Sequence, residues 1–187
     1  MTTTPRIPPL PPDRWDPEIR PLLEANEARM GRPLNIFATF ANHPKLLKRW
    51  SVLANHALFK TTLPAREREL LILRTGFRCG SDYEWGQHVG IAREAELTDV
   101  EIDRVAAGPA VEGWSRADRA LLQAADELHD DQLVADATWD ELSLDWDTEQ
   151  LMDIVFTVGI YTQIAMALRS FGVQREDGVP GLPDGTP

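Results

Sequence analysis

Two neighbouring helical segments place ionisable residues on faces that should be buried, and this constrains the fold most. In the first, over about residues 64 to 77, apolar residues such as Leu70 and Phe77 recur with helical spacing and mark the inner face. Glu69 lies on or beside this stripe, whereas Arg74 is expected on the solvated side. A buried carboxylate is costly unless it is paired. Glu69 is therefore either a structural residue held by an Arg or by backbone donors, or a carboxyl that transfers protons.

The second segment follows Gly80 and carries Glu84 and His88 one turn apart. Ser81 and Glu84 have the spacing of a capping box, in which each side chain bonds the backbone N–H of the other residue. His88 shares the inward face with Trp85. An inward histidine is commonly a core residue, but a nearby carboxylate would fix its tautomer and raise its basicity. Because a tight turn joins the two helices, we expect the buried carboxylate of the first helix within hydrogen-bond reach of His88, directly or through one water.

These motifs resemble the carboxymuconolactone decarboxylase family, which shares its fold with the alkylhydroperoxidase D-like proteins. The resemblance covers about residues 30 to 175 and rests on Arg-Glu-Leu-Leu-Ile-Leu followed by Gly-Ser-Asp-Tyr-Glu-Trp-Gly-Gln-His, with support from a later Leu-Thr-Asp-x-Glu-Ile helix start. It implies an all-α, alkylhydroperoxidase D-like helical bundle that forms a single domain and assembles as a homo-oligomer, as a trimer or hexamer.

Redox members of the family carry Glu followed by Cys-x-x-Cys-x-x-x-His. When the motifs are aligned on the histidine, the family Glu falls on Glu69, the histidine on His88, and the two cysteines on Ser81 and Glu84. Neither of these last two residues can form a disulfide, and Cys79 is the single cysteine of the chain. The departure argues against disulfide chemistry and leaves the Glu and His half of the site, which suits proton transfer.

The leading hypothesis is therefore a cofactor-independent enzyme, a decarboxylase-like lyase that acts on a small organic acid or lactone by decarboxylation, isomerisation or dehydration. His88 would be the general acid/base. Glu69 would orient it or act as a second proton carrier, and Glu84 would fix its tautomer or contact the substrate. Further substrate contacts are expected from the same helix: Ser81, Tyr83 and Trp85.

Three alternatives stay open at this point. The first is a non-catalytic, oligomeric ligand-binding or interaction module on the same fold, in which Ser81 and Glu84 only cap a helix. The second, weaker, is an alkylhydroperoxidase-type antioxidant. The third is a metal site that would use Glu69, Glu84 and His88 as ligands, although the resemblance implies no metal.

Charge and composition limit the partners. The net charge of −11 argues against nucleic acid or an anionic membrane, since both need a basic face, but a local arginine could still bind an anionic substrate. A single cysteine fits a reducing cytoplasm, and the first residues show no apolar run typical of a signal peptide. No stretch free of polar residues reaches membrane-spanning length.

Along the chain, residues 1–14 form a Pro-rich arm, residues 15–172 the helical domain, and residues 173–187 a Gly/Pro-rich tail that is expected to be loose or to lie on a partner chain. Helix starts are predicted near Pro44, Thr98, Ser115 and Thr138, and no segment alternates like a strand. The final helix, about residues 148 to 170, is apolar nearly all round and predicts burial on several sides, with part of it at a subunit interface. The role of His56 is unassigned.

Overall fold

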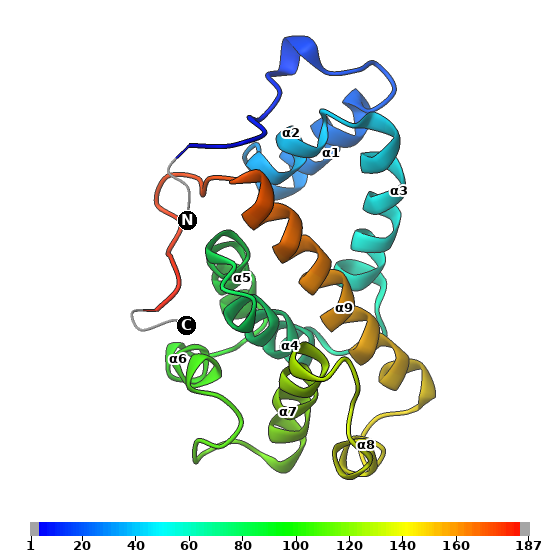
Figure 1. Cartoon of the computed structure of the whole chain (residues 1–187), viewed down its shortest axis with the longest axis vertical. Coiled ribbons are helices and arrows are strands. Elements are labelled where there is room, and N and C mark those ends of the chain that lie inside the picture. The colour runs from blue at the N-terminus through cyan, green and yellow to red at the C-terminus, as the bar shows by residue number, and fades with distance from the viewer. Residues whose placement is uncertain (1–3, 184–187) are drawn as a thin grey trace.

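The computed structural model describes residues 4–183, and within that range it contains helices and no strand. In chain order the elements are η1 (Pro12–Arg14), α1 (Arg20–Met30), α2 (Asn35–Phe40), α3 (Pro44–Asn55), η2 (His56–Lys60), α4 (Ala65–Arg78), α5 (Asp82–Glu94), α6 (Asp99–Ala107), α7 (Arg116–Asp130), α8 (Asp136–Leu142) and α9 (Thr148–Phe171). In Figure 1, α9 crosses the molecule between a group formed by α1, α2 and α3 and a second group formed by α6, α7 and α8. The prediction of an all-α fold is confirmed.

Side-chain caps define several of the helix starts. Thr98 and Glu101 form the full capping box at the start of α6, and the Ser115 hydroxyl accepts a hydrogen bond from the Asp118 N–H at the start of α7. Helix α8 begins two residues before the predicted Thr138. The sequence patterns did not predict α2 or the π-helical turn η2, which continues α3.

Helix α9 forms the shared core of the molecule. It packs against α4, α5, α7 and η2, and its inward residues join the clusters on both sides of it. By length and composition alone α9 could cross a membrane, but half of its most apolar stretch is buried inside the protein, as in the core helix of many folds. Its solvent side nevertheless exposes three large apolar side chains: Met152, Phe156 and Met166.

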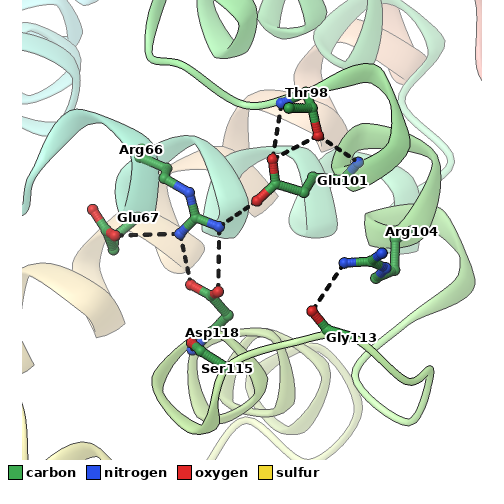
Figure 2. A network of polar contacts seen from close by, with 8 residues as sticks. All are labelled: Arg66, Glu67, Thr98, Glu101, Arg104, Gly113, Ser115 and Asp118. Atoms are coloured by element: carbon green, nitrogen blue, oxygen red, sulfur yellow. Dashed lines mark hydrogen bonds and ion pairs between the residues drawn. The ribbon is translucent and has the colours of Figure 1, made fainter.

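A polar network fixes the first turn of α4 against α6 and α7 (Figure 2). The Arg66 guanidinium donates to Asp118 Oδ1 at 2.7 Å and to Glu101 Oε1 at 2.6 Å, while the Thr98 N–H and hydroxyl donate to Glu101 Oε2. Burial alone would raise the pKa of Glu101, but the hydrogen bonds from Arg66 and Thr98 lower it to about 2. The network therefore holds three helices together over the ordinary pH range.

The position of Arg74 corrects the sequence-based expectation that it would be solvated. Arg74 is only 5 % exposed, and its guanidinium donates to both carboxylate oxygens of Asp126, at 2.6 and 2.8 Å. It also donates to the carbonyl oxygens of Val105 and Ala106 at the end of α6. An arginine with a carboxylate partner and further hydrogen bonds to carbonyl oxygens is tolerated in the interior, and this one fixes the middle of α4 against α6 and α7.

The described part of the tail, residues 173–183, lies on α5 of its own chain, so the expectation of a loose or partner-bound tail is wrong for these residues; residues 184–187 lie outside the described range. Arg175 pairs with Asp82 Oδ2 at 2.5 Å, and the Leu182 N–H donates to Asp82 Oδ1 at 2.8 Å. Glu176 accepts a hydrogen bond from the Tyr83 hydroxyl at 2.8 Å. The tail is thus anchored to the start of the helix that carries the predicted site.

Residues 4–14 of the Pro-rich arm also contact the domain. The N–H groups of Arg6 and Ile7 both donate to the Phe171 carbonyl oxygen at the end of α9, and the Leu10 N–H donates to the Ala38 carbonyl oxygen. These bonds place the arm beside α2 and the C-terminal end of α9.

Gly86 lies where the tail crosses α5, and its substitution should release the tail. A Cβ at this position would clash with the Pro180 carbonyl oxygen and lie 2.6 Å from Val179 Cγ1. We expect Gly86→Ala to lower the free energy of unfolding by about 1–3 kcal/mol, as overpacking typically does. Gly90→Ala on the same helix, with nothing within 4 Å, should be neutral or stabilising because Ala favours helix. Urea unfolding of both variants measures this, and equal effects would contradict the packing of the tail on α5.

Candidate functional site

A buried carboxylate–imidazole pair joins α4 and α5. His88 Nδ1–H donates to Glu69 Oε2 at 2.7 Å, and Arg68 Nε–H donates to the other oxygen, Glu69 Oε1, at 2.9 Å. Glu69 is fully buried and His88 is 7 % exposed. This confirms the prediction that the two groups approach within hydrogen-bond reach. Because the carboxylate holds the proton on Nδ1, the lone pair of the neutral imidazole lies on Nε2.

A cavity of about 440 Å³ lies above this pair, between α1, α3 and η2 on one side and α5 and α9 on the other. Glu84 and His88 both line it, whereas Glu69 lies behind His88 and does not. Its walls are mainly apolar and aromatic, with contributions from Phe37, Trp50, Phe59 and Tyr161. The arrangement gives a small molecule access to the imidazole while the supporting carboxylate stays out of contact with it.

Tyr161 of α9 completes the inner end of the cavity, and it was missed by the sequence analysis. Its ring packs edge-to-face on the His88 imidazole, with ring centroids 5.0 Å apart. Burial, followed by the charge of Glu69, raises the pKa of Tyr161 well above its ordinary value, so its hydroxyl stays protonated. In the sequence, Tyr161 could be noticed only as a phenol within a mainly apolar helix. The packing of α9 on α5 is what brings its ring to His88.

Glu84 differs sharply from the other carboxyl group of the site. Both of its carboxyl oxygens are buried and have no hydrogen-bond partner among the described residues. Burial raises the pKa of Glu84 well above its ordinary value, which favours the neutral carboxylic acid. Gly76 of α4 lies opposite, and a Cβ there would approach Glu84 Oε1 to 3.3 Å. The glycine therefore leaves room for the inward-pointing carboxyl.

The capping box predicted for Ser81 and Glu84 is wrong. Ser81 precedes the first residue of α5 at the N-cap position, but its side chain makes no cap, and its hydroxyl is buried without a partner in the described structure. The S-x-x-E spacing permits a box, but the space beside Gly76 takes the Glu84 carboxyl into the interior instead. The structural role that competed with a functional one for Glu84 is thereby removed.

The three expected substrate contacts have different positions. Tyr83 lines the cavity, although its hydroxyl is already bonded to Glu176 and to the Ile36 N–H. Trp85 does not line it, because the side chain lies on the opposite side of α5 in a core cluster, with its ring 5.9 Å from that of Phe77. Ser81 is buried away from the lining as well. Neither Trp85 nor Ser81 is therefore placed to contact a ligand in this cavity.

Cys79 and His56 lie outside this site. Cys79 Sγ is 3.6 Å from His129 Nδ1, and burial, then the nearby Glu84 carboxyl, raises the pKa of its thiol. His56 Nε2 is 3.0 Å from Asp153 Oδ1, where it links η2 to α9. Within residues 4–183, no group of three or more His, Cys, Asp or Glu side chains is placed to hold a metal ion.

The neutral state of Glu84 predicts a pH-dependent stability. A carboxyl whose pKa is raised on folding contributes stability that is fully present below its unfolded value of 4.5 and is lost as the pH rises through the folded value. Gln is neutral throughout, so Glu84→Gln should gain stability relative to the wild type by up to about 1.4 kcal/mol per pH unit in that window. Urea unfolding of the wild type and of Glu84→Gln at about pH 5 and at about pH 8 measures this difference in stability. A constant difference would mean that Glu84 is ionised in the folded protein.

The helical bundle has the alkylhydroperoxidase D-like fold that the sequence predicted. Residues 44–127 match the model of the carboxymuconolactone decarboxylase family. The match covers a little under half of the chain and supports the family resemblance that the motifs predicted. The comparison with curated protein sequences gives no match.

Solved structures share the fold over nearly the whole chain. An uncharacterised peroxidase-related protein with an alkylhydroperoxidase AhpD core, from Ralstonia eutropha JMP134, has 20 % identity and a TM-score of 0.83, with 95 % of each chain covered. A peroxidase-related protein from Silicibacter sp. TM1040 has 16 % identity and a TM-score of 0.81 over 96 % of this chain and 97 % of its own. The debrominase Bmp8, as a variant in complex with 2,3,4-tribromopyrrole, has 16 % identity and a TM-score of 0.80 over 95 % of each chain. At these identities the likeness establishes the fold.

Proposed function

We propose that the chain is a cofactor-independent enzyme that transfers protons on an organic acid or lactone, in a decarboxylation, isomerisation or dehydration. One observation carries this proposal. His88 accepts support from Glu69 at 2.7 Å and lines a cavity beside Glu84, whose carboxyl group has no hydrogen-bond partner within residues 4–183. Two carboxyl groups in one site with opposite environments commonly divide acid and base roles.

The three groups would act in sequence. His88 Nε2, which makes no hydrogen bond among the described residues, would take a proton from the substrate or return it. Glu69 would stabilise the imidazolium formed in this step, because its carboxylate already accepts the Nδ1 proton. Glu84, as a neutral acid, would donate a hydrogen bond to the substrate oxygen on which negative charge develops.

In a decarboxylation, the bond between the carboxylate carbon and its neighbour breaks, and carbon dioxide leaves. The electron pair of that bond moves into the conjugated system of the substrate and gives an enolate, whose oxygen Glu84 would stabilise. His88, which becomes an imidazolium when Nε2 first takes the acid proton of the substrate carboxyl group, then gives this proton to carbon and returns to the neutral state. Isomerisation needs the same groups, with a proton removed from one carbon and returned to another.

One of the similar solved structures bears on the class of ligand. The debrominase Bmp8 binds a flat halogenated ring in its complex, and the aromatic walls of the cavity here suit a flat ligand as well. An alkylhydroperoxidase-type activity is the weakest proposal, because the chain has one cysteine and its thiol pKa is raised. A ligand-binding module without turnover is the main rival, since an apolar cavity alone suffices for it.

A substrate screen separates the enzyme from the module. The purified protein is incubated with a panel of unsaturated acids and lactones, and proton NMR follows both consumption and line broadening. The proposal predicts that at least one compound is converted and that His88→Ala stops the conversion. Compounds that bind, as shown by line broadening, but remain unchanged throughout would favour the binding module.

Assembly and location complete the proposal. The exposed apolar residues Met152, Phe156 and Met166 on α9 support a homo-oligomer, with a trimer or hexamer implied by the family resemblance, and a cytoplasmic location is proposed with it. Light scattering at micromolar concentration should give a mass of several chains. A mass equal to the 21.0 kDa of one chain would refute the assembly.

A further inference from the structure

The lining of the cavity includes two basic side chains, although the chain as a whole carries a net charge of −11. Two cations, Arg29 of α1 and Lys48 of α3, line the cavity and are exposed at its outer side. Among the described residues, Glu84 is the sole carboxyl group in the lining, and it lies buried at the inner end. The exposed part of the lining therefore carries two cations and, among the described residues, no carboxyl group.

Arg29 is the cation that remains available to a ligand. Its guanidinium lies over the Phe59 ring, 4.3 Å from the ring centroid, and makes no ion pair within the described part of the chain. Lys48, in contrast, pairs with Glu18 at 3.3 Å. Stacking on Phe59 holds the guanidinium plane in place, while its edge N–H groups stay free for the two oxygens of a carboxylate.

The walls behind Arg29 are apolar over the depth of the cavity. They include Leu22, Met30, Leu58, Ile164 and Leu168. The volume of about 440 Å³ equals that of about fifteen water molecules at about 30 Å³ each. A very small acid would leave much of this apolar space filled with water, whereas a longer apolar body would displace that water favourably.

We propose that the cavity binds an amphipathic carboxylate, with its anionic group at Arg29 and an apolar body that extends toward His88. The orientation of its reacting end toward His88 rests on the proposed function, but the binding itself does not. The reacting carbonyl, lactone or second acid group then lies at the inner end, opposite the group that Arg29 holds. Arg29 is on this view a residue that selects anionic over neutral ligands.

The test compares octanoate with octanol, which share an apolar chain and differ in charge. Calorimetry or competition binding is performed on the wild type, on Arg29→Gln and on Arg49→Gln, which removes a charge from α3 without touching the cavity lining. We expect Arg29→Gln to weaken octanoate binding about tenfold or more and to leave octanol within about twofold, since a charge-assisted hydrogen bond is lost. Arg49→Gln should leave both ligands within about twofold.

The Arg29→Lys variant separates the effect of the positive charge from the effect of the packing of Arg29 on Phe59. It keeps the cation and loses the planar fork, so it should retain more octanoate affinity than Arg29→Gln. Equal losses for octanoate and octanol in Arg29→Gln would overturn the proposal, because Arg29 would then only support Phe59. Wild-type protein that does not bind octanoate would overturn it as well. Octanoate has no reactive group, so these results are independent of turnover, and a failure of the proposed chemistry would show only in the substrate screen.

Discussion

The His88→Ala variant should lose most turnover on any confirmed substrate, by about 10²–10⁴-fold, which is the usual cost of removing a general acid/base. The reason is geometric: His88 is the imidazole that both faces the cavity and receives support from a buried carboxylate, at 2.7 Å. Initial-rate kinetics at saturating substrate measure the effect on kcat. The fold should survive, because the side chain lies against a cavity and not within a packed cluster.

A matched control for this variant is available at the next position. Val89 is buried in the core cluster on the other side of α5. Val89→Ala should lower the free energy of unfolding by about 1–3 kcal/mol and leave kcat within a few-fold. If His88→Ala unfolds the protein, or retains its turnover while folded, proton transfer by His88 is excluded and the binding module becomes the better account.

Glu69→Gln should reduce kcat by about 10²-fold or more with little change in KM, since Glu69 does not line the cavity. The amide keeps the shape of the side chain but lacks the negative charge that stabilises an imidazolium and fixes its tautomer. Glu69 is a positioning residue in this account. Nitrogen NMR of the histidines should therefore show the Nδ1-protonated tautomer of His88 in the wild type and a mixture in the variant.

Glu67→Gln gives the control, because Glu67 lies on the same helix and pairs with Arg66 at 3.3 Å instead. It should leave kcat and the His88 tautomer unchanged. A Glu69→Gln variant with wild-type kcat on a confirmed substrate would mean that the carboxylate is purely structural.

The central pair could be predicted because its determinants are local. Glu69 and His88 lie on consecutive helices that a tight turn at Gly80 joins, so periodicity alone brings them to one side. The caps at Thr98 and Ser115 were predictable for the same reason, since the partner atoms lie within three residues. Local spacing was not sufficient for Glu84, where a capping box competed with an inward rotamer and the decisive factor was Gly76 on another helix.

Features that depend on distant packing could not be predicted. Tyr161 reaches His88 only because α9 crosses α5, and Arg74 is buried only because Asp126 of α7 meets it. Trp85 shares a helical face with His88 by simple spacing, yet its large ring turns into the core beside Phe77. Helical periodicity predicts the direction of a side chain around the helix axis to within about one quarter of a turn. Whether that side chain lines a cavity or packs in the core depends on the neighbouring helices.

The most direct test of the central claim is deuterium incorporation from solvent into a converted acid or lactone, followed by proton NMR in D₂O without added thiol or peroxide. The account predicts deuterium at the carbon that is protonated, with wild-type rates in Cys79→Ser and with loss of incorporation in His88→Ala. Peroxide consumption that requires thiol and disappears in Cys79→Ser would contradict it, because the chemistry would then depend on the cysteine and not on proton transfer.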